Sequence, residues 1–497
     1  MGIVRRQSTY STIFTYLGFA IGALNTMILF PRFFSTEAFG LTRIMIDFSL
    51  FFSALSTMGS LNALYKFNPF YKDFLPKGKN DLPYLTLMAN LIGSILFLIA
   101  AVGFEPFWEK HFGHGSPLFV THFRLVIPFT ISYTAIMVLE AYCWVIKKTI
   151  ISNIVKELFY RLTTTLFIFF YIMHWISLET FFVLFSYSYV PAILVLMYVV
   201  YQNGGVTLYR TISRATKRLY KKILVFTSYH YTGMLIGVLP RTVDGLLIAG
   251  LTDKGLENLA IYSIPVYLAS IMDGPYRSML GITTTLISEA WKNKDMAKIK
   301  ELYHKTSINL LIIGLLIFGV LMPNIDNLIR FNPEYSLAKA IFIVAGLAKI
   351  IDLGMGMNAQ ILLLSKYWRM DFYSSLLFIF INIILDYFMI RHYGVMGAAY
   401  GSAIALIFYN IIRFTYLWWL FKLQPFDRKT LYVLLIAAAA IFITWVIPYL
   451  GNLYLDAIVR SLVFTILYLP TVIYFKISED INAMFKGMLQ KILPKSR

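Results

Sequence analysis

Residues 82–104 read LPYLTLMANLIGSILFLIAAVGF, a run of twenty-three residues without a charged side chain. A helix needs about twenty apolar residues to cross the roughly 30 Å hydrocarbon core of a bilayer. The run is long enough, and it does not alternate apolar with polar residues as a strand of an outer-membrane barrel would. We therefore predict that it forms one membrane-spanning helix.

Similar apolar blocks fill most of the chain. Of its 497 residues, 59% are hydrophobic and only 14% are charged, too few to cover a soluble protein of this length. The sequence predicts an all-α integral membrane protein with about fourteen spans. The other thirteen blocks lie near 10–31, 41–65, 119–146, 152–175, 178–201, 224–250, 259–288, 306–329, 337–365, 371–391, 395–421, 430–450 and 455–476.

The basic residues predict how the spans are oriented. Most of the 44 Lys and Arg lie in one alternate set of short loops, and the opposite set contains only Arg32, Lys110, Lys254, Arg330 and Arg391. Because cytoplasmic loops carry the excess of Lys and Arg, both termini are expected in the cytoplasm. The net charge of +19 follows from this topology, and no nucleic-acid partner is expected.

A weak internal repeat divides the chain. Residues 16–24, YLGFAIGAL, match residues 231–239, YTGMLIGVL, at five of nine positions. The match places span one on span seven, so the halves would have six spans each and insert in the same direction. We predict an N-lobe over 1–201, a basic cytoplasmic linker over 202–223, a C-lobe over 224–421, and two further spans with a cytoplasmic tail over 422–497.

Two stretches resemble a known family. Residues 382–401, NIILDYFMIRHYGVMGAAYG, resemble the junction of spans eleven and twelve in polysaccharide flippases, and residues 30–41, FPRFFSTEAFGL, resemble their link from span one to span two. These flippases are the Wzx-type exporters of lipid-linked oligosaccharides in the multidrug/oligosaccharidyl-lipid/polysaccharide (MOP) superfamily. On physical grounds, Gly394, Gly397 and Gly401 predict a tight turn followed by a small face for close helix packing.

The resemblance implies a fold and a function. Two six-helix lobes in a parallel pseudo-two-fold repeat would surround a central cavity. By alternating access they would carry an undecaprenyl-diphosphate-linked oligosaccharide, such as an O-antigen, capsule or exopolysaccharide repeat unit, to the outer leaflet of a bacterial inner membrane. Glycosyltransferases and a polymerase of the same pathway would be partners. A peptidoglycan lipid-precursor flippase or a MATE-like small-molecule exporter remains possible, and a membrane-embedded glycan-modifying enzyme is a distant alternative.

Charges inside the spans are the residues most informative about function, because each is costly in hydrocarbon unless it pairs or faces water. Helical spacing of three or four residues predicts four local pairs: Arg43/Asp47, Arg241/Asp244, Asp273/Arg277 and Lys349/Asp352. We expect Arg124, Arg161, Arg413, Glu140 and Asp386 to lack such a local partner.

These charges provide the candidate site residues. An Arg fork binds phosphate oxygens and keeps its charge when partly desolvated, so a cationic cavity for a diphosphate is predicted from Arg277, Lys349, Arg241, Arg43 and Arg124. Candidates for coupling transport to H⁺ or Na⁺ are Asp47, Glu140, Asp244 and Asp386. The competing interpretation is that the pairs are structural bridges and that charges near span ends snorkel to the interface.

Other chemistry is not expected. The single cysteine, Cys143, cannot form an internal disulfide, and His111 and His114 lack a third metal ligand nearby. No phosphate-cradling glycine-rich loop occurs, so neither ATP use nor a cofactor is predicted, and the chain is not expected to be an enzyme. Pro240, Pro265 and Pro275 predict kinks in spans seven and eight.

Overall fold

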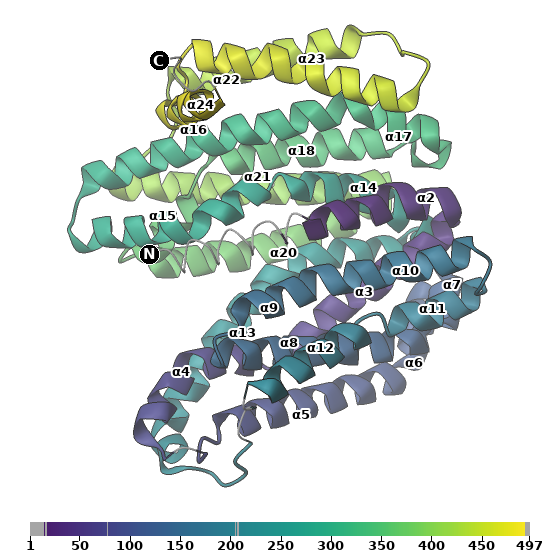
Figure 1. Cartoon of the computed structure of the whole chain (residues 1–497), viewed down its shortest axis with the longest axis vertical. Helices are drawn as coiled ribbons and strands as arrows, with labels where there is room; N and C mark the ends of the chain where they lie inside the picture. The colour runs from purple at the N-terminus through teal and green to yellow at the C-terminus, as the bar shows by residue number, and fades with distance from the viewer. Residues whose placement is uncertain (1–13, 15–16, 77, 204, 206–207, 493–497) are drawn as a thin grey trace. The chain divides into compact units, whose positions relative to one another are not determined.

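The computed structural model describes residues 14, 17–76, 78–203, 205 and 208–492, with the side chains of residues 72, 241, 331 and 487–492 outside that part. Every regular element in the described ranges is helical (Figure 1). The chain forms two compact units, residues 1–260 and 261–497, and each is considered by itself.

The first unit contains the helices up to α13 and the start of α14. Its elements are η1 (Leu24–Leu29), α2 (Phe30–Phe33), α3 (Thr36–Ser56), α4 (Ser60–Phe74), α5 (Leu82–Gly103), α6 (Glu105–Phe112), α7 (Pro117–Thr121), η2 (Phe123–Leu125), α8 (Val126–Val145), α9 (Thr149–Ile154), η3 (Val155–Phe159), α10 (Tyr160–Ile172), α11 (Leu178–Ser186), α12 (Val190–Gln202), α13 (Arg214–Leu251) and α14 (Gly255–Ile271).

The second unit holds the remaining helices. They are α15 (Gly274–Lys292), α16 (Met296–Leu321), η4 (Met322–Asn324), α17 (Ile325–Phe331), η5 (Pro333–Tyr335), α18 (Ala338–Gly354), α19 (Asn358–Leu364), α20 (Trp368–Tyr393), α21 (Val395–Phe421), α22 (Arg428–Val446), α23 (Leu453–Tyr474) and α24 (Glu479–Ile492). Within this unit α22 and α23 pack on each other and on α16.

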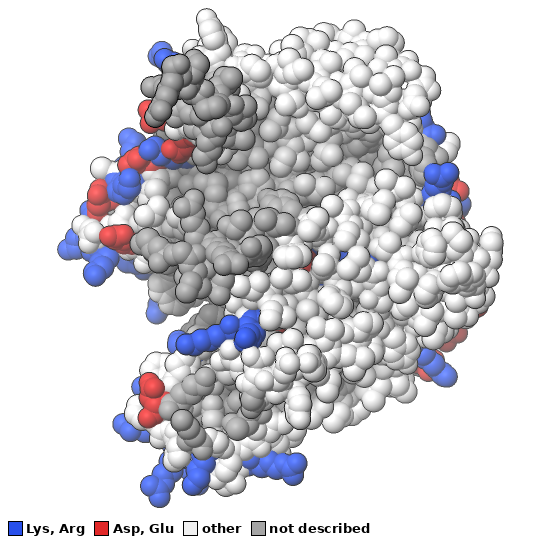
Figure 2. Space-filling model, in the orientation of Figure 1, with Lys and Arg blue, Asp and Glu red and all other residues white. Residues whose placement is uncertain are grey.

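The predicted fold class is confirmed. Ten described helices are long and apolar enough to cross a membrane, and the bent pair α18–α19 makes eleven. Helix α5 shows the lipid-facing character expected of such helices, since Ile95, Leu96 and Ile99 are each more than half exposed. In Figure 2 the charged side chains gather toward the edges of the viewed face and leave most of the surface between them uncharged.

Several predicted spans are broken helices. Block 41–65 is interrupted between α3 and α4, where Met58 and Gly59 both have positive φ. Block 259–288 is split at Met272 and Asp273, and α15 then begins at Gly274 with Pro275 in its first turn. Block 337–365 bends by 46° between α18 and α19. In contrast, α13 and α14 continue through Pro240 and Pro265.

Helix α13 packs against α3 and α4 within the first unit. The approach is close at Gly59, where an added Cβ would lie 2.7 Å from the Tyr231 Cβ and 2.9 Å from the Thr227 carbonyl oxygen. This packing is why the first compact unit extends past the 202–223 linker and includes α13. The lobe boundaries inferred from the repeat remain a prediction.

The glycine-rich hairpin between α20 and α21 forms as predicted. Gly394 turns the chain with φ 58°, and a Cβ at Gly397 would collide with the Met389 backbone. At Gly401 an added Cβ would collide with Asp386. The small residues therefore allow two long helices to lie in backbone contact.

Candidate functional site

Several of the candidate site residues lie in two clusters of charged side chains, one in each unit. The C-terminal charge cluster consists of Asp273, Arg277, Lys349, Asp352 and Asn410. The N-terminal charge cluster consists of Arg43, Asp47, Glu140, Lys156 and Asp244.

Lys349 lies at the centre of the C-terminal charge cluster. Its Nζ is 2.9 Å from the Asp273 Oδ1 and 3.2 Å from the Asp352 Oδ2, and its side chain is only 20% exposed. Asp352 also accepts a 2.9 Å hydrogen bond from the Asn410 Nδ2. One buried cation therefore ties the turn before α15 to α18, and Asn410 extends the network to α21.

Arg277 is held much more loosely. Its NH2 lies 3.8 Å from the Asp273 Oδ2, a long distance for an ion pair, and its side chain is 48% exposed. The break between α14 and α15 explains the geometry: Asp273 is the N-cap residue of α15, and Arg277 lies one turn into that helix. Arg277 is thus an accessible cation, and together with Lys349 it balances the formal charges of Asp273 and Asp352.

The N-terminal charge cluster brings two carboxylates close together. Asp47 on α3 interacts electrostatically with both Arg43 and Asp244, the latter on α13. The two helices approach so closely that a Cβ on Gly245 would collide with an Asp47 carboxylate oxygen. Within the described part of the chain the Arg43 Nε is buried and has no hydrogen-bond partner.

Glu140 and Lys156 form a second pair in this cluster. The Lys156 Nζ donates a 2.7 Å hydrogen bond to the Glu140 Oε2, joining α8 to the π-helical turn η3. Nearby, Tyr160 stacks on Tyr189 with 4.4 Å between ring centroids. As expected, Glu140 has no basic partner three or four residues away, but it pairs with Lys156, sixteen residues later in the chain.

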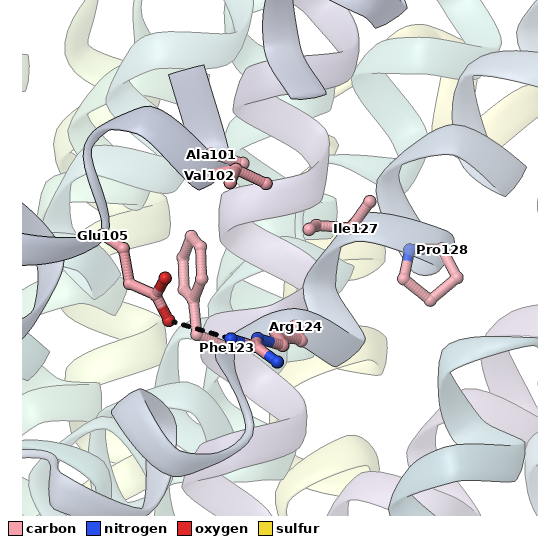
Figure 3. A pocket seen from close by; sticks show the side chains of 7 residues that line it. All are labelled: Ala101, Val102, Glu105, Phe123, Arg124, Ile127 and Pro128. Atoms are coloured by element: carbon pink, nitrogen blue, oxygen red, sulfur yellow. Dashed lines mark ion pairs between the residues drawn. The ribbon is translucent and has the colours of Figure 1, made fainter. Parts of the chain in front are cut away.

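Arg124 occupies a different position from the other candidate cations. It belongs to η2, the short turn before α8, and its side chain is 84% exposed with its NH2 3.7 Å from the Glu105 Oε1. With Ala101, Val102, Glu105, Phe123, Ile127 and Pro128 it lines a pocket of about 260 Å³ (Figure 3). The candidate membrane span Phe123–Val145 includes Arg124, which lies in the short turn at the start of that span.

Two other predicted site residues add little to either cluster. Asp386 is fully buried in the α20–α21 hairpin and accepts a 2.6 Å hydrogen bond from the Asn382 Nδ2. Its contact with Gly401 gives it a packing role. The backbone of Arg241 belongs to α13, but its side chain lies outside the described part of the structure.

Sequence reasoning missed several ion pairs. Arg161 lies 3.2 Å from Glu157, four residues earlier, so the expectation that it has no local partner was wrong. Arg413 pairs with Asp371 across the α20–α21 hairpin. Arg460 and Asp456 form a buried pair at 2.6 Å within α23, a spacing that the sequence also contained.

The predicted residues thus separate into groups. Arg277 and Lys349 come together in the second unit, and Arg43, Asp47 and Asp244 come together in the first. Arg124 joins neither cluster. Two of the predicted local pairs, Asp273/Arg277 and Lys349/Asp352, are present as ion pairs.

Comparison with known proteins identifies the fold. Neither models of known protein families nor curated protein sequences give a match. The solved structure of the lipid II flippase MurJ in an inward closed conformation aligns with a TM-score of 0.72 and 16% identity, covering 94% of this chain and 98% of that one.

MOP superfamily transporters align as well. An inward-facing multidrug resistance MATE transporter of this superfamily gives a TM-score of 0.63 at 11% identity, covering 83% of this chain and 94% of the other. A MOP transporter from Pyrococcus furiosus, with a binding pocket described as having reverse polarity, gives 0.53 at 13% identity, covering 84% and 95%. The chain therefore has the fold seen in these transporters.

Proposed function

We propose that this protein is a flippase that moves a polyprenyl-diphosphate-linked oligosaccharide across a bacterial cytoplasmic membrane. The fold it shares with a lipid II flippase and with multidrug exporters supports transport as the general activity. The resemblance of residues 30–41 and 382–401 to Wzx-type flippases supports a lipid-linked glycan as the substrate.

The observation that carries the proposal is the arrangement around Arg277. A transported diphosphate needs a cation that is accessible and yet positioned within the helix bundle. Arg277 is half-exposed, and its NH2 lies 3.8 Å from the Asp273 Oδ2. Lys349 makes the shorter contact with Asp273, at 2.9 Å from its Oδ1. The Arg277 guanidinium can therefore turn toward a phosphate and form two hydrogen bonds without leaving a buried carboxylate unpaired.

The N-terminal charge cluster supplies a site for coupling to an ion. Asp47 and Asp244 interact across α3 and α13, beside Arg43. Two carboxylates in a low-dielectric environment repel each other, so binding a proton or Na⁺ there lowers the electrostatic energy. We assign Asp47 and Asp244 to ion coupling and regard Glu140 and Asp386 as structural in their pairings with Lys156 and Asn382.

Alternating access requires helices that can bend. The breaks at Met58–Gly59, at Met272–Asp273 and between α18 and α19 interrupt the hydrogen-bonded backbone at three places. Two of these breaks adjoin the C-terminal charge cluster, since Asp273 lies at one and Asp352 lies just before the other. We propose that motion at these breaks changes the position of Arg277 during transport.

Complementation tests the proposal. In a strain that lacks its oligosaccharide flippase, the wild-type protein should restore surface glycan, and Arg277→Ala should reduce export by about tenfold or more, since a hydrogen bond to a charged group contributes about 1.5–3 kcal/mol. Arg391→Ala, an exposed arginine at the end of α20, is the matched control and should export normally. Normal export by Arg277→Ala would refute the assignment of this residue.

The same assay separates the alternatives. Rescue of a strain depleted of its peptidoglycan-precursor flippase, with no effect on surface glycan, would identify the substrate as that precursor. Increased resistance to organic cations without glycan export would instead indicate a small-molecule exporter. We favour a lipid diphosphate over an organic cation because the accessible charge in the C-terminal charge cluster is cationic. We favour the glycan over the peptidoglycan precursor because residues 30–41 and 382–401 resemble Wzx-type flippases.

A further inference from the structure

A large pocket lies in the first unit, where α4 ends and α13 begins. Its volume is about 930 Å³, within the range of small-molecule binding sites. Its walls come from the end of α4, from Leu75, Pro76 and Lys79 after it, from residues 209, 212 and 213, and from the first turns of α13. The lining consists of Phe70, Phe74, Leu75, Pro76, Lys79, Tyr209, Ile212, Ser213, Arg214, Ala215, Arg218, Leu219 and Lys222.

The lining is strongly basic. Arg214, Arg218 and Lys222 are spaced by four residues, so they lie on one face of α13, and Lys79 faces the same pocket. None of the four cations makes an ion pair with a described residue, and no acidic side chain is among the lining residues. Like charges at this spacing repel one another, so an anion in the pocket would relieve the repulsion.

The pocket has a fixed framework. The buried carboxylate of Asp81 accepts hydrogen bonds from the Ser213 backbone N–H at 2.8 Å and from the Thr216 Oγ1 at 2.7 Å. The Thr216 hydroxyl is also 2.7 Å from the Tyr71 hydroxyl on α4. These contacts tie the start of α13 to α4 and to the loop after it, so that the basic face and the opposite wall keep their spacing.

One wall is apolar and open. Phe74 is 67% exposed, Ile212 is 54% exposed and Phe70 is 50% exposed, all beside the cations. Inorganic phosphate would gain nothing from this surface. A lipid would use both features, because its phosphate would meet the cations while its chain lies along the aromatic side chains.

We infer that this pocket binds the phosphate head group of an anionic lipid at the cytoplasmic membrane surface. The side of the membrane follows from the basic character of the 202–223 linker. None of its lining residues belongs to the C-terminal charge cluster, and the inference does not depend on which substrate is transported.

Paired substitutions test the site in the full-length protein. Arg218→Gln with Lys222→Gln removes two lining cations, and Lys217→Gln with Lys221→Gln removes two exposed cations from the same turns outside the lining. Purified proteins would be incubated with phosphatidylglycerol or with undecaprenyl diphosphate in detergent, and retained lipid would be counted by native mass spectrometry. The lining variant should bind at least one of these lipids about thirtyfold more weakly, because each of the two basic residues contributes about 1 kcal/mol near the surface. The control variant should bind as the wild type does.

The pattern of lost binding identifies the kind of lipid that the pocket holds. Selective loss for phosphatidylglycerol identifies a phospholipid site, and selective loss for undecaprenyl diphosphate identifies a prenyl-lipid site. Equal behaviour of the two variants would overturn the inference, because general electrostatic attraction would then explain binding. Phe74→Ala should weaken lipid binding without affecting inorganic pyrophosphate, and pyrophosphate binding as tightly as the lipids would refute the lipid assignment.

Discussion

The Nζ of Lys349 lies 2.9 Å from the Oδ1 of Asp273, seventy-six residues earlier in the chain. This contact links the break between α14 and α15 to α18, and a second bond to Asp352 completes the bridge. It neutralises the carboxylate that would otherwise hold Arg277. The bridge is therefore both a packing element and the reason that Arg277 remains accessible.

Removing Lys349 should destabilise the second unit. Lys349→Met leaves Asp273 and Asp352 without their shared cation, and breaking a largely buried pair costs about 3 kcal/mol or somewhat less. Thermal unfolding in detergent should show a clear fall in Tm. Adding Asp273→Asn should restore part of the loss, and Lys339→Met, which breaks a more exposed bridge to Asp326, should have a smaller effect. Equal losses for the two single variants would contradict this account.

The Asp47 and Asp244 pair should control ion coupling. Asp47→Asn or Asp244→Asn removes one of two interacting carboxylates, so export should lose its dependence on the proton or Na⁺ gradient while the protein still inserts. Export would be measured in inverted vesicles with each gradient imposed in turn. Asp253→Asn, an exposed carboxylate after α13, is the control. Unchanged gradient dependence in both cluster variants would remove them from the coupling site.

Close packing in the α20–α21 hairpin should tolerate no side chain at Gly397. A Cβ there meets the Met389 backbone, which cannot rotate away as a side chain can. Gly397→Val should destabilise the protein by about 1–3 kcal/mol or prevent its accumulation, as overpacking does. Gly281→Val is the comparison, since nothing lies within 4 Å of a Cβ built at that position. Similar expression and Tm for both variants would contradict the packing argument.

The orientation of the spans can be tested by labelling. Lys110→Cys and Lys217→Cys, each placed in a Cys143→Ala background, put a thiol at an exposed position on α6 and on α13. A membrane-impermeant maleimide added to intact cells should label position 110, and label position 217 only after permeabilisation. Labelling of both positions from one side would show that the predicted topology is wrong.

Periodicity and composition were sufficient for the fold class because hydrocarbon solvent leaves little choice. A run such as 82–104 must satisfy its backbone hydrogen bonds internally, so it becomes a helix, and α5 covers residues 82–103. The small residues of 394–401 likewise predicted a tight helical hairpin. Where a backbone break lies inside an apolar block, as at Met58–Gly59, the hydropathy of the block gave no sign of it.

Charge pairing was predicted only in part. Local spacing identified Asp273/Arg277 and Lys349/Asp352, since residues three or four apart share a helix face. It could not show that Lys349 prefers Asp273, or that Glu140 meets Lys156 and Arg413 meets Asp371, because those contacts join different helices. The basic pocket could be predicted only in part for the same reason. The sequence shows three cations at regular spacing on α13, but not that packing brings them beside Lys79 and the aromatic wall supplied by α4.

The sequence by itself determined that this chain crosses a membrane as many helices, because about twenty consecutive apolar residues have no other stable structure in a bilayer. It also specified which charges lie within those helices. Only the tertiary structure decided which of them are neutralised and which stay accessible, because the energy of a charge in a low-dielectric medium depends on neighbours brought close by packing. Arg277 is a candidate for substrate binding for that reason, and Arg124 is exposed with Glu105 as its acidic neighbour.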